Sequence, residues 1–154
     1  MPPSRTAVVE VLVTRNDSFD PQAFRQESLE RVLREQGRTS PLPPWIRHPE
    51  IPRYSIGWRM GYGEDYMTIW WHWAEGRSAE EKTAYFREFA PIQTEWVDWV
   101  GMQIVMDEEE EDDDAAPSLE DDIRKYGEAI AHLGLYDVEA WQAYLKAAPT
   151  DEEV

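Results

Sequence analysis

Residues 64–74, Glu-Asp-Tyr-Met-Thr-Ile-Trp-Trp-His-Trp-Ala, hold three of the eight tryptophans of the chain. The spacing of Tyr66, Trp70 and Trp73 places them on one face of a helix, and the acidic residues that begin it suit the positive end of the helix dipole. Three tryptophans within four residues cover most of the helix circumference. Either other elements surround this helix or one tryptophan is exposed. Trp71 lies off the main stripe and is then the expected partner anchor.

Helices are expected on both sides of this tryptophan cluster. Asp20 followed by Pro21 starts one helix, which Gly37 ends. Residues 78–81, Ser-Ala-Glu-Glu, form a capping box that starts another. Residues 118–148 carry two amphipathic patterns separated by a glycine and predict a helical hairpin. Because two helices alone seldom form a stable core, the hairpin is expected to dock on the rest of the chain or on a partner.

Short strands are expected beside the helices. Residues 7–13 are β-branched and almost continuously apolar, which favours a buried strand over a buried helix. Residues 54–60 predict a second short strand, and residues 102–106 are either a third strand or the end of a helix. The predicted fold class is therefore α+β and mostly helical, with a small antiparallel sheet packed by helices. The five prolines of residues 41–52 predict an extended connection.

The negative charge is concentrated near the C-terminus. The chain carries 15 basic and 32 acidic residues, a net charge of -17. Residues 1–106 hold 12 basic and 15 acidic residues, whereas residues 107–154 hold 3 and 17. Because a dense acidic block leaves little to bury, we expect an aromatic-rich globular body over 1–106, an acidic linker over 107–117 and the hairpin over 118–148.

The composition argues against several classes of protein. The chain has no cysteine, which excludes thiol catalysis, disulfide bonds and cysteine-bound metals. No run of about 18 apolar residues is present, and the N-terminal residues do not have the pattern of a signal peptide. We therefore expect a cytoplasmic protein with no membrane attachment. Direct binding to nucleic acid is not expected, because it requires clustered lysine and arginine.

The sequence predicts no enzyme, no metal site and no cofactor. The three histidines are far apart and form no metal-binding or catalytic motif. His72 with Glu64 and Asp65 on the same helix is the acid–base arrangement that the spacing allows. The glycines of residues 57–63 match no phosphate-binding loop and predict a turn. The acidic block lacks the ligand spacing of a calcium-binding loop.

The acidic residues have two interpretations. As a solvated linker they add only solubility, whereas as a binding surface they attract a basic partner. Toxin nucleases and deaminases carry basic grooves, so we expect a protein that neutralises a basic partner, most concretely the immunity protein of a bacterial toxin. The alternative is an accessory or adaptor subunit of a larger bacterial complex. The expected partner-binding residues are Trp71, Asp107, Glu108, Glu109, Glu110, Glu111, Asp112, Asp113, Asp114, Glu120, Asp121 and Asp122.

Overall fold

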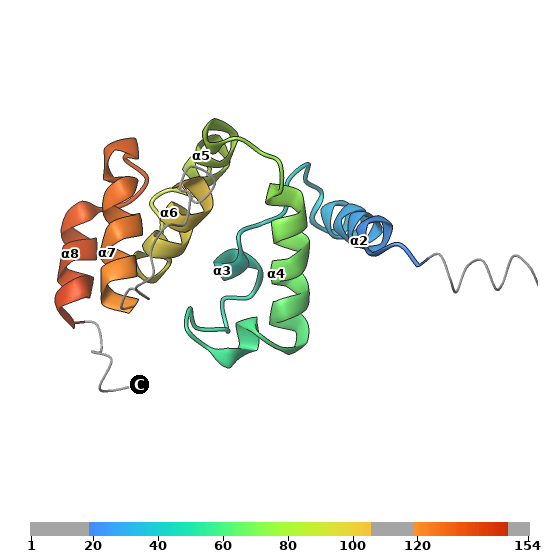
Figure 1. Ribbon diagram of the computed structural model, residues 1–154, viewed down its shortest axis with the longest axis horizontal. Coiled ribbons are helices and arrows are strands. Elements are labelled where there is room, and N and C mark those ends of the chain that lie inside the picture. The colour runs from blue at the N-terminus through green and yellow to red at the C-terminus, as the bar shows by residue number, and fades with distance from the viewer. Residues whose placement is uncertain (1–18, 106–118, 148–154) are drawn as a thin grey trace, which may run out of the picture. The chain divides into compact units, whose positions relative to one another are not determined.

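The computed structural model describes residues 19–105 and 119–147 of the chain (Figure 1). Contacts divide the chain into two compact units, Met1–Glu75 and Gly76–Val154. Among the described residues, no helix has both the length and the apolar character that crossing a bilayer requires. The α-helices are α2 (Pro21–Gln36), α3 (Pro44–Arg47), α4 (Gly61–Ala74), α5 (Ala79–Arg87), α6 (Val97–Val105), α7 (Leu119–Ala129) and α8 (Val138–Ala147), and the short 3-10 helices are η1 (Ile56–Trp58), η2 (Thr94–Trp96) and η4 (Ala131–Leu133).

The predicted antiparallel sheet is wrong, because the described residues contain no strand. Residues 54–60 form a turn and the 3-10 helix η1. A strand needs a neighbour that pairs its backbone groups, and no such neighbour is formed here. The Trp58 indole instead donates to the Pro52 carbonyl at 2.9 Å and is buried. The other large apolar side chains of this segment are exposed, namely Tyr54, Ile56 and Met60.

Four further segments either decide between alternatives, differ from expectation or lie outside the described residues. Residues 102–105 continue helix α6, because the helical spacing of apolar residues extends to Ile104, which is buried. The alternative of a third strand over 102–106 is therefore wrong. The proline-rich segment contains the one-turn helix α3, with Pro44 at the first position, where its missing N–H leaves no helix hydrogen bond unmade. Residues 7–13 and 107–117 lie outside the described residues.

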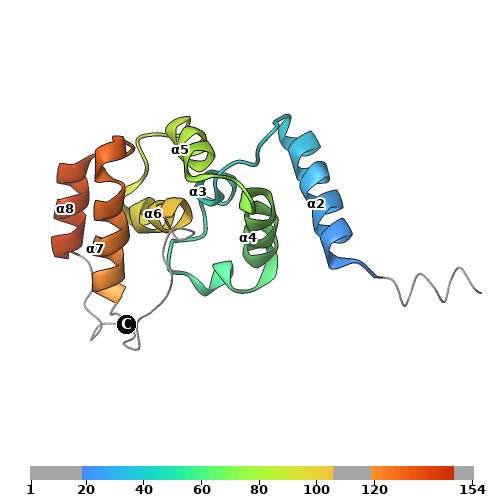
Figure 2. The same cartoon turned by 45° about the horizontal axis from the view of Figure 1, so that its top comes forward.

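Helix α4 is the centre of the first unit and packs against α2, α3 and η1 (Figure 1, Figure 2). Its Tyr66 hydroxyl donates to the Leu42 carbonyl at 2.6 Å and accepts from the Gln36 amide at 3.1 Å. These bonds tie α4 to the end of α2 and to the segment that leads into α3. The buried apolar side chains of this unit include Leu29, Trp45, Ile51, Trp58, Tyr66, Met67, Trp70 and Trp73.

The predicted helix starts at residues 20 and 78 are confirmed. The Asp20 carboxylate accepts from the backbone N–H of Gln22 at 2.9 Å, and α2 ends at Gly37 in the left-handed conformation with φ 64°. The Ser78 hydroxyl accepts from the backbone N–H of Glu81 at 3.1 Å at the start of α5. Each such N-cap typically contributes about 1 kcal/mol to helix stability.

In the second unit, α6 packs against both α5 and α7, and α7 and α8 run side by side (Figure 2). These two helices occupy the stretch predicted as a helical hairpin. The Tyr136 hydroxyl between them donates to the carbonyl of Gly127 on α7 at 2.7 Å, and its ring contacts Trp141 of α8. The buried apolar side chains of this unit include Phe86, Trp96, Val97, Trp99, Val100, Ile104, Ile123, Ile130, Leu135 and Trp141.

The close crossing of α6 and α7 depends on Gly101. A Cβ atom at this position would overlap the backbone carbonyl of Tyr126 on α7. We expect Gly101→Ala to lower the free energy of unfolding by about 1–3 kcal/mol, because the helices must move apart. This loss exceeds the roughly 1 kcal/mol by which alanine favours a helix over glycine. Urea unfolding followed by circular dichroism measures the change, and a variant as stable as the wild type would contradict the close crossing.

Candidate protein-interaction site

Helix α4 exposes one of its three tryptophans. Trp70 is 0% exposed and Trp73 is 7% exposed, whereas Trp71 is 50% exposed. The rings of Trp70 and Trp73 contact each other, with centroids 5.8 Å apart. An exposed indole on a rigid helix has a large area to bury in a partner, and tryptophan is enriched at interface hot spots. Of the two alternatives that the sequence left open, the structure has the one with an exposed tryptophan, Trp71, and its role in binding stays a prediction.

Two carboxylates flank Trp71 on the same side of the helix. Glu64, Thr68, Trp71 and Glu75 are spaced so that they follow one side of α4 and its first C-terminal residue. Glu64 and Glu75 are exposed. The Thr68 hydroxyl donates to the backbone carbonyl of Glu64, one turn earlier in α4, at 3.0 Å. We call these four residues the Trp71 face. An apolar ring with a negative group on either side suits a partner that carries lysine or arginine.

A side-chain network next to Trp71 joins α4 to α2. The Nε2 atom of His72 lies 3.0 Å from the Oε1 atom of Gln26. The Gln26 amide in turn donates to the carboxylate of Glu30 at 3.3 Å. This network links α2 to α4 through Gln26, which contacts both the exposed Glu30 and the residue that follows Trp71. Helix α4 therefore contacts α2 near the C-terminal end that carries Trp71.

The acid–base arrangement that spacing allowed on this helix is not formed. His72 is hydrogen-bonded to the Gln26 amide and not to Glu64 or Asp65. Within residues 19–105 and 119–147, no group of three or more histidine, aspartate or glutamate side chains is arranged to hold a metal ion. Gly57 of η1 and Gly63 of α4 have a structural role, because a Cβ atom on Gly63 would overlap the carbonyl of Gly57.

The predicted acidic residues of the hairpin lie in the first turn of α7. Glu120 and Asp121 are exposed, and Asp122 is partly buried. Acidic residues at this position stabilise the helix through its dipole. The Glu120 carboxylate also lies 3.7 Å from the Arg124 guanidinium one turn along. The predicted acidic block at 107–114 falls outside the described residues, so of the predicted acidic residues the structure places only these three.

The two units differ strongly in charge. The first unit carries 9 basic and 10 acidic residues, a net charge of -1, and the second carries 6 and 22, a net charge of -16. A field of that sign increases the rate at which a basic partner is encountered, and salt screens it over a Debye length of about 8 Å at physiological ionic strength. The Trp71 face, by contrast, would interact with a partner only at short range, after the two proteins have come into contact.

The sequence did not reveal a cluster of side chains around His48, in the loop after α3. It consists of His48, Glu50, Tyr62 and Tyr66, and we call it the histidine cluster. His48 is buried, and its Nδ1 atom lies 3.2 Å from the Oε1 atom of Glu50. The same carboxylate oxygen accepts from the Tyr62 hydroxyl at 3.2 Å. The imidazole contacts the rings of Tyr62 and Tyr66, with centroids 4.8 and 5.4 Å apart. The cluster therefore joins this loop to α4.

The surroundings of this cluster change how its members titrate. Burial, followed by the nearby Arg47 guanidinium, lowers the pKa of His48 below its usual value of 6.5. A backbone hydrogen bond, with smaller contributions from Tyr62 and His48, lowers the pKa of Glu50. Loss of water and the bond to Glu50 raise the pKa of the Tyr62 hydroxyl. At neutral pH the cluster therefore contains a neutral imidazole, a carboxylate and a protonated tyrosine that donates to it.

Acidification is expected to destabilise the protein through His48. In the unfolded chain this histidine regains its usual pKa of 6.5, so as the pH falls below that value the unfolded state binds the proton first. Stability is therefore fully present above the unfolded pKa and is lost as the pH falls toward the folded pKa. In thermal unfolding between about pH 7 and pH 5.5, we expect His48→Gln to flatten the dependence of Tm on pH. An unchanged slope in this variant would contradict the assignment.

Comparison of the chain with protein-family models, curated proteins and solved structures gave no match.

Proposed function

We propose that this chain binds and neutralises a basic partner protein, in the manner of an immunity protein that inhibits a bacterial toxin. The observation that carries the proposal is the Trp71 face, an exposed indole between the exposed carboxylates of Glu64 and Glu75 on a helix packed from several sides. A preorganised aromatic side chain costs little entropy when a partner covers it. The Trp71 face thus combines a large apolar side chain for a partner to bury with charged groups that can pair with the partner.

The carboxylates determine which kind of partner this anchor fits. A partner that covered Trp71 with an acidic or apolar surface would leave Glu64 and Glu75 desolvated without a counter-charge, which is costly. A partner that presents lysine or arginine at those points forms charge-assisted hydrogen bonds instead. The net charge of -16 on the second unit acts in the same direction, by attracting a basic surface before contact.

The bound chain would neutralise its partner by covering the partner's substrate-binding surface. Enzymes that act on nucleic acids bind phosphate through clusters of lysine and arginine. A protein whose carboxylates pair with those side chains, and whose indole fills an adjacent apolar pocket, prevents the substrate from reaching them. No covalent chemistry and no cofactor are required in this mechanism. The inhibition is competitive and weakens as salt is raised.

Capture experiments test the proposed function. The tagged full-length chain is incubated with nuclease-treated lysate of the source cells, washed with steps of rising salt and analysed by mass spectrometry. We expect one basic protein to be released at raised salt and to be missing when Trp71→Ala is the bait. Phe24→Ala is the matched control, because Phe24 is an exposed aromatic side chain of α2 outside the Trp71 face. It should capture the same protein as the wild type.

A second candidate function is that of a non-catalytic adaptor subunit. The observation that favours it is a further set of exposed apolar side chains in the first unit, which includes Tyr54, Ile56, Met60 and Tyr62. An adaptor needs more than one contact surface, and apolar contacts do not weaken in salt. Recovery of a multi-subunit assembly that persists at high salt, with Trp71→Ala as well as with the wild type, would favour the adaptor and contradict the inhibitor.

A further inference from the structure

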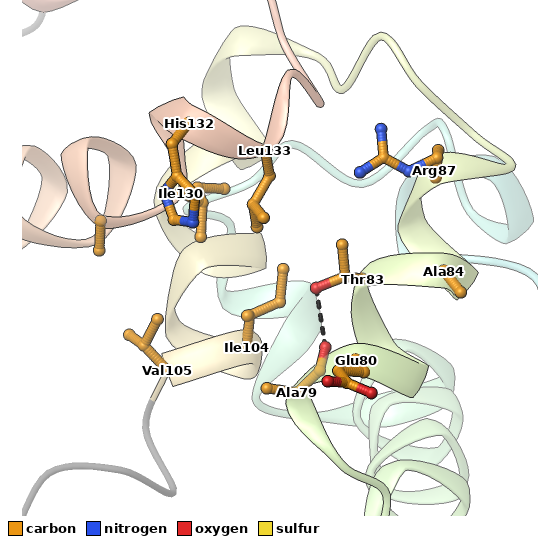
Figure 3. A pocket seen from close by; sticks show the side chains of 11 residues that line it. Ala79, Glu80, Thr83, Ala84, Arg87, Ile104, Val105, Ile130, His132 and Leu133 are labelled. Atoms are coloured by element: carbon orange, nitrogen blue, oxygen red, sulfur yellow. Dashed lines mark hydrogen bonds between the residues drawn. The ribbon is translucent and has the colours of Figure 1, made fainter.

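A pocket in the second unit lies among α5, the end of α6 and the turn that follows α7 (Figure 3). Its volume is about 470 Å³. Small-molecule sites typically measure about 300–1,000 Å³ and combine an apolar lining with a few polar groups. The pocket has the size of such a site, and it lies in a different unit from the Trp71 face.

The floor of the pocket is apolar. Ile104 of α6 and Ile130 at the end of α7 are buried there, and Leu133 lies beside them. Figure 3 shows the side chains of Ile104 and Leu133 pointing toward each other, and Thr83 of α5 lies on the side of Arg87. The Thr83 hydroxyl donates to the carbonyl of Ala79 at 2.7 Å, so its single donor hydrogen is already used within α5. This floor suits an alkyl chain or an aromatic ring.

The charged groups stand at the rim. Arg87 and Glu80 lie two turns apart on α5, at opposite ends of one wall, and His132 lies on the facing wall (Figure 3). In the described part of the chain, Arg87 forms no ion pair, although its unit contains 22 acidic residues. An exposed guanidinium that pairs with no carboxylate of the described residues, beside an apolar pocket, is a group that a ligand carboxylate can pair with.

We propose that this pocket binds a small monocarboxylate with an apolar acyl or aromatic body. The carboxylate accepts two parallel hydrogen bonds from the Arg87 guanidinium, and the apolar body lies on Ile104, Ile130 and Leu133. Glu80, at the far end of the same wall, repels a second negative group, so a dicarboxylate of equal length binds less well. The ligand class is thus set by one positive group, one negative group and the apolar surface between them.

The first test needs only the wild-type chain. Decanoate, decan-1-ol and decanedioate share one chain length and differ in their end groups, and each is titrated below its micelle concentration while amide shifts are recorded by NMR. We expect decanoate to shift the amides of Thr83, Arg87, Ile104 and Leu133, and to bind about tenfold more tightly than the alcohol and the diacid. Equal affinity of acid and alcohol, shifts elsewhere in the chain or no binding of decanoate would each overturn the proposal.

Variants test the assigned contacts. Arg87→Gln should weaken decanoate binding about tenfold and leave decan-1-ol unaffected. Arg124→Gln removes the same charge from the same unit but lies outside the pocket, and it should bind decanoate as the wild type does. Ala84→Trp, at an exposed lining position, should block both ligands. If Arg87→Gln binds decanoate as tightly as the wild type, the carboxylate assignment is wrong.

Discussion

Replacement of Trp70 with alanine is expected to lower the free energy of unfolding by about 3–5 kcal/mol, the range for a fully buried tryptophan. The adjacent substitution Trp71→Ala is expected to cost less than about 1 kcal/mol, because half of that side chain is already in water. The two variants remove the same atoms from neighbouring positions of one helix. Their difference therefore measures what the buried environment of Trp70, including its ring contact with Trp73, contributes to stability.

Chemical unfolding followed by far-ultraviolet circular dichroism makes this comparison. The result matters for function because a tryptophan that contributes little to stability is available to a partner. If Trp71→Ala lost as much stability as Trp70→Ala, the indole would be part of the core and the Trp71 face would not be a binding surface. A marginal loss leaves binding as the role that its exposure supports.

Charge reversal on the Trp71 face is expected to slow association with the proposed basic partner. In the double variant Glu64→Lys/Glu75→Lys, two attractive contacts become repulsive, and the association rate at low salt should fall by about tenfold or more. The difference from the wild type should shrink as salt is raised, since screening removes both attraction and repulsion. Stopped-flow mixing over a series of salt concentrations measures both effects.

A matched control separates the local face from the net charge. Glu27 and Glu35 are exposed on α2, so Glu27→Lys/Glu35→Lys changes the charge of the same unit by the same amount. We expect this control to bind at nearly the rate of the wild type. If both double variants slowed association equally, the total charge of the unit would explain the effect and the Trp71 face would have no special role.

Local signals in the sequence predicted the helices well. Asp20 and Ser78 cap their helices through their own side chains, and these interactions depend on residues at most three positions away. The sequence left open whether one tryptophan of this helix is exposed, but the 100° rotation per residue identified Trp71 as the one that lies off the stripe of Trp70 and Trp73. Each of these features is determined within a single helix.

The failed predictions concerned features that depend on distant residues. The apolar pattern over residues 54–60 fits a strand, but a strand also requires a pairing neighbour, and η1 forms where Trp58 reaches the Pro52 carbonyl. The histidine cluster was missed because the loop residues His48 and Glu50 meet a tyrosine of α4 that only the tertiary fold brings near. No local spacing contains that information.

The most direct test of the proposed interaction is the affinity of the captured basic protein for three versions of the full-length chain. Isothermal titration calorimetry compares the wild type, Trp71→Ala and Phe24→Ala at one salt concentration. A hot-spot tryptophan contributes about 2–4 kcal/mol, so we expect Trp71→Ala to raise Kd by about 30-fold or more and Phe24→Ala to leave it unchanged. Equal Kd values for the wild type and Trp71→Ala would contradict the Trp71 face as the site of binding.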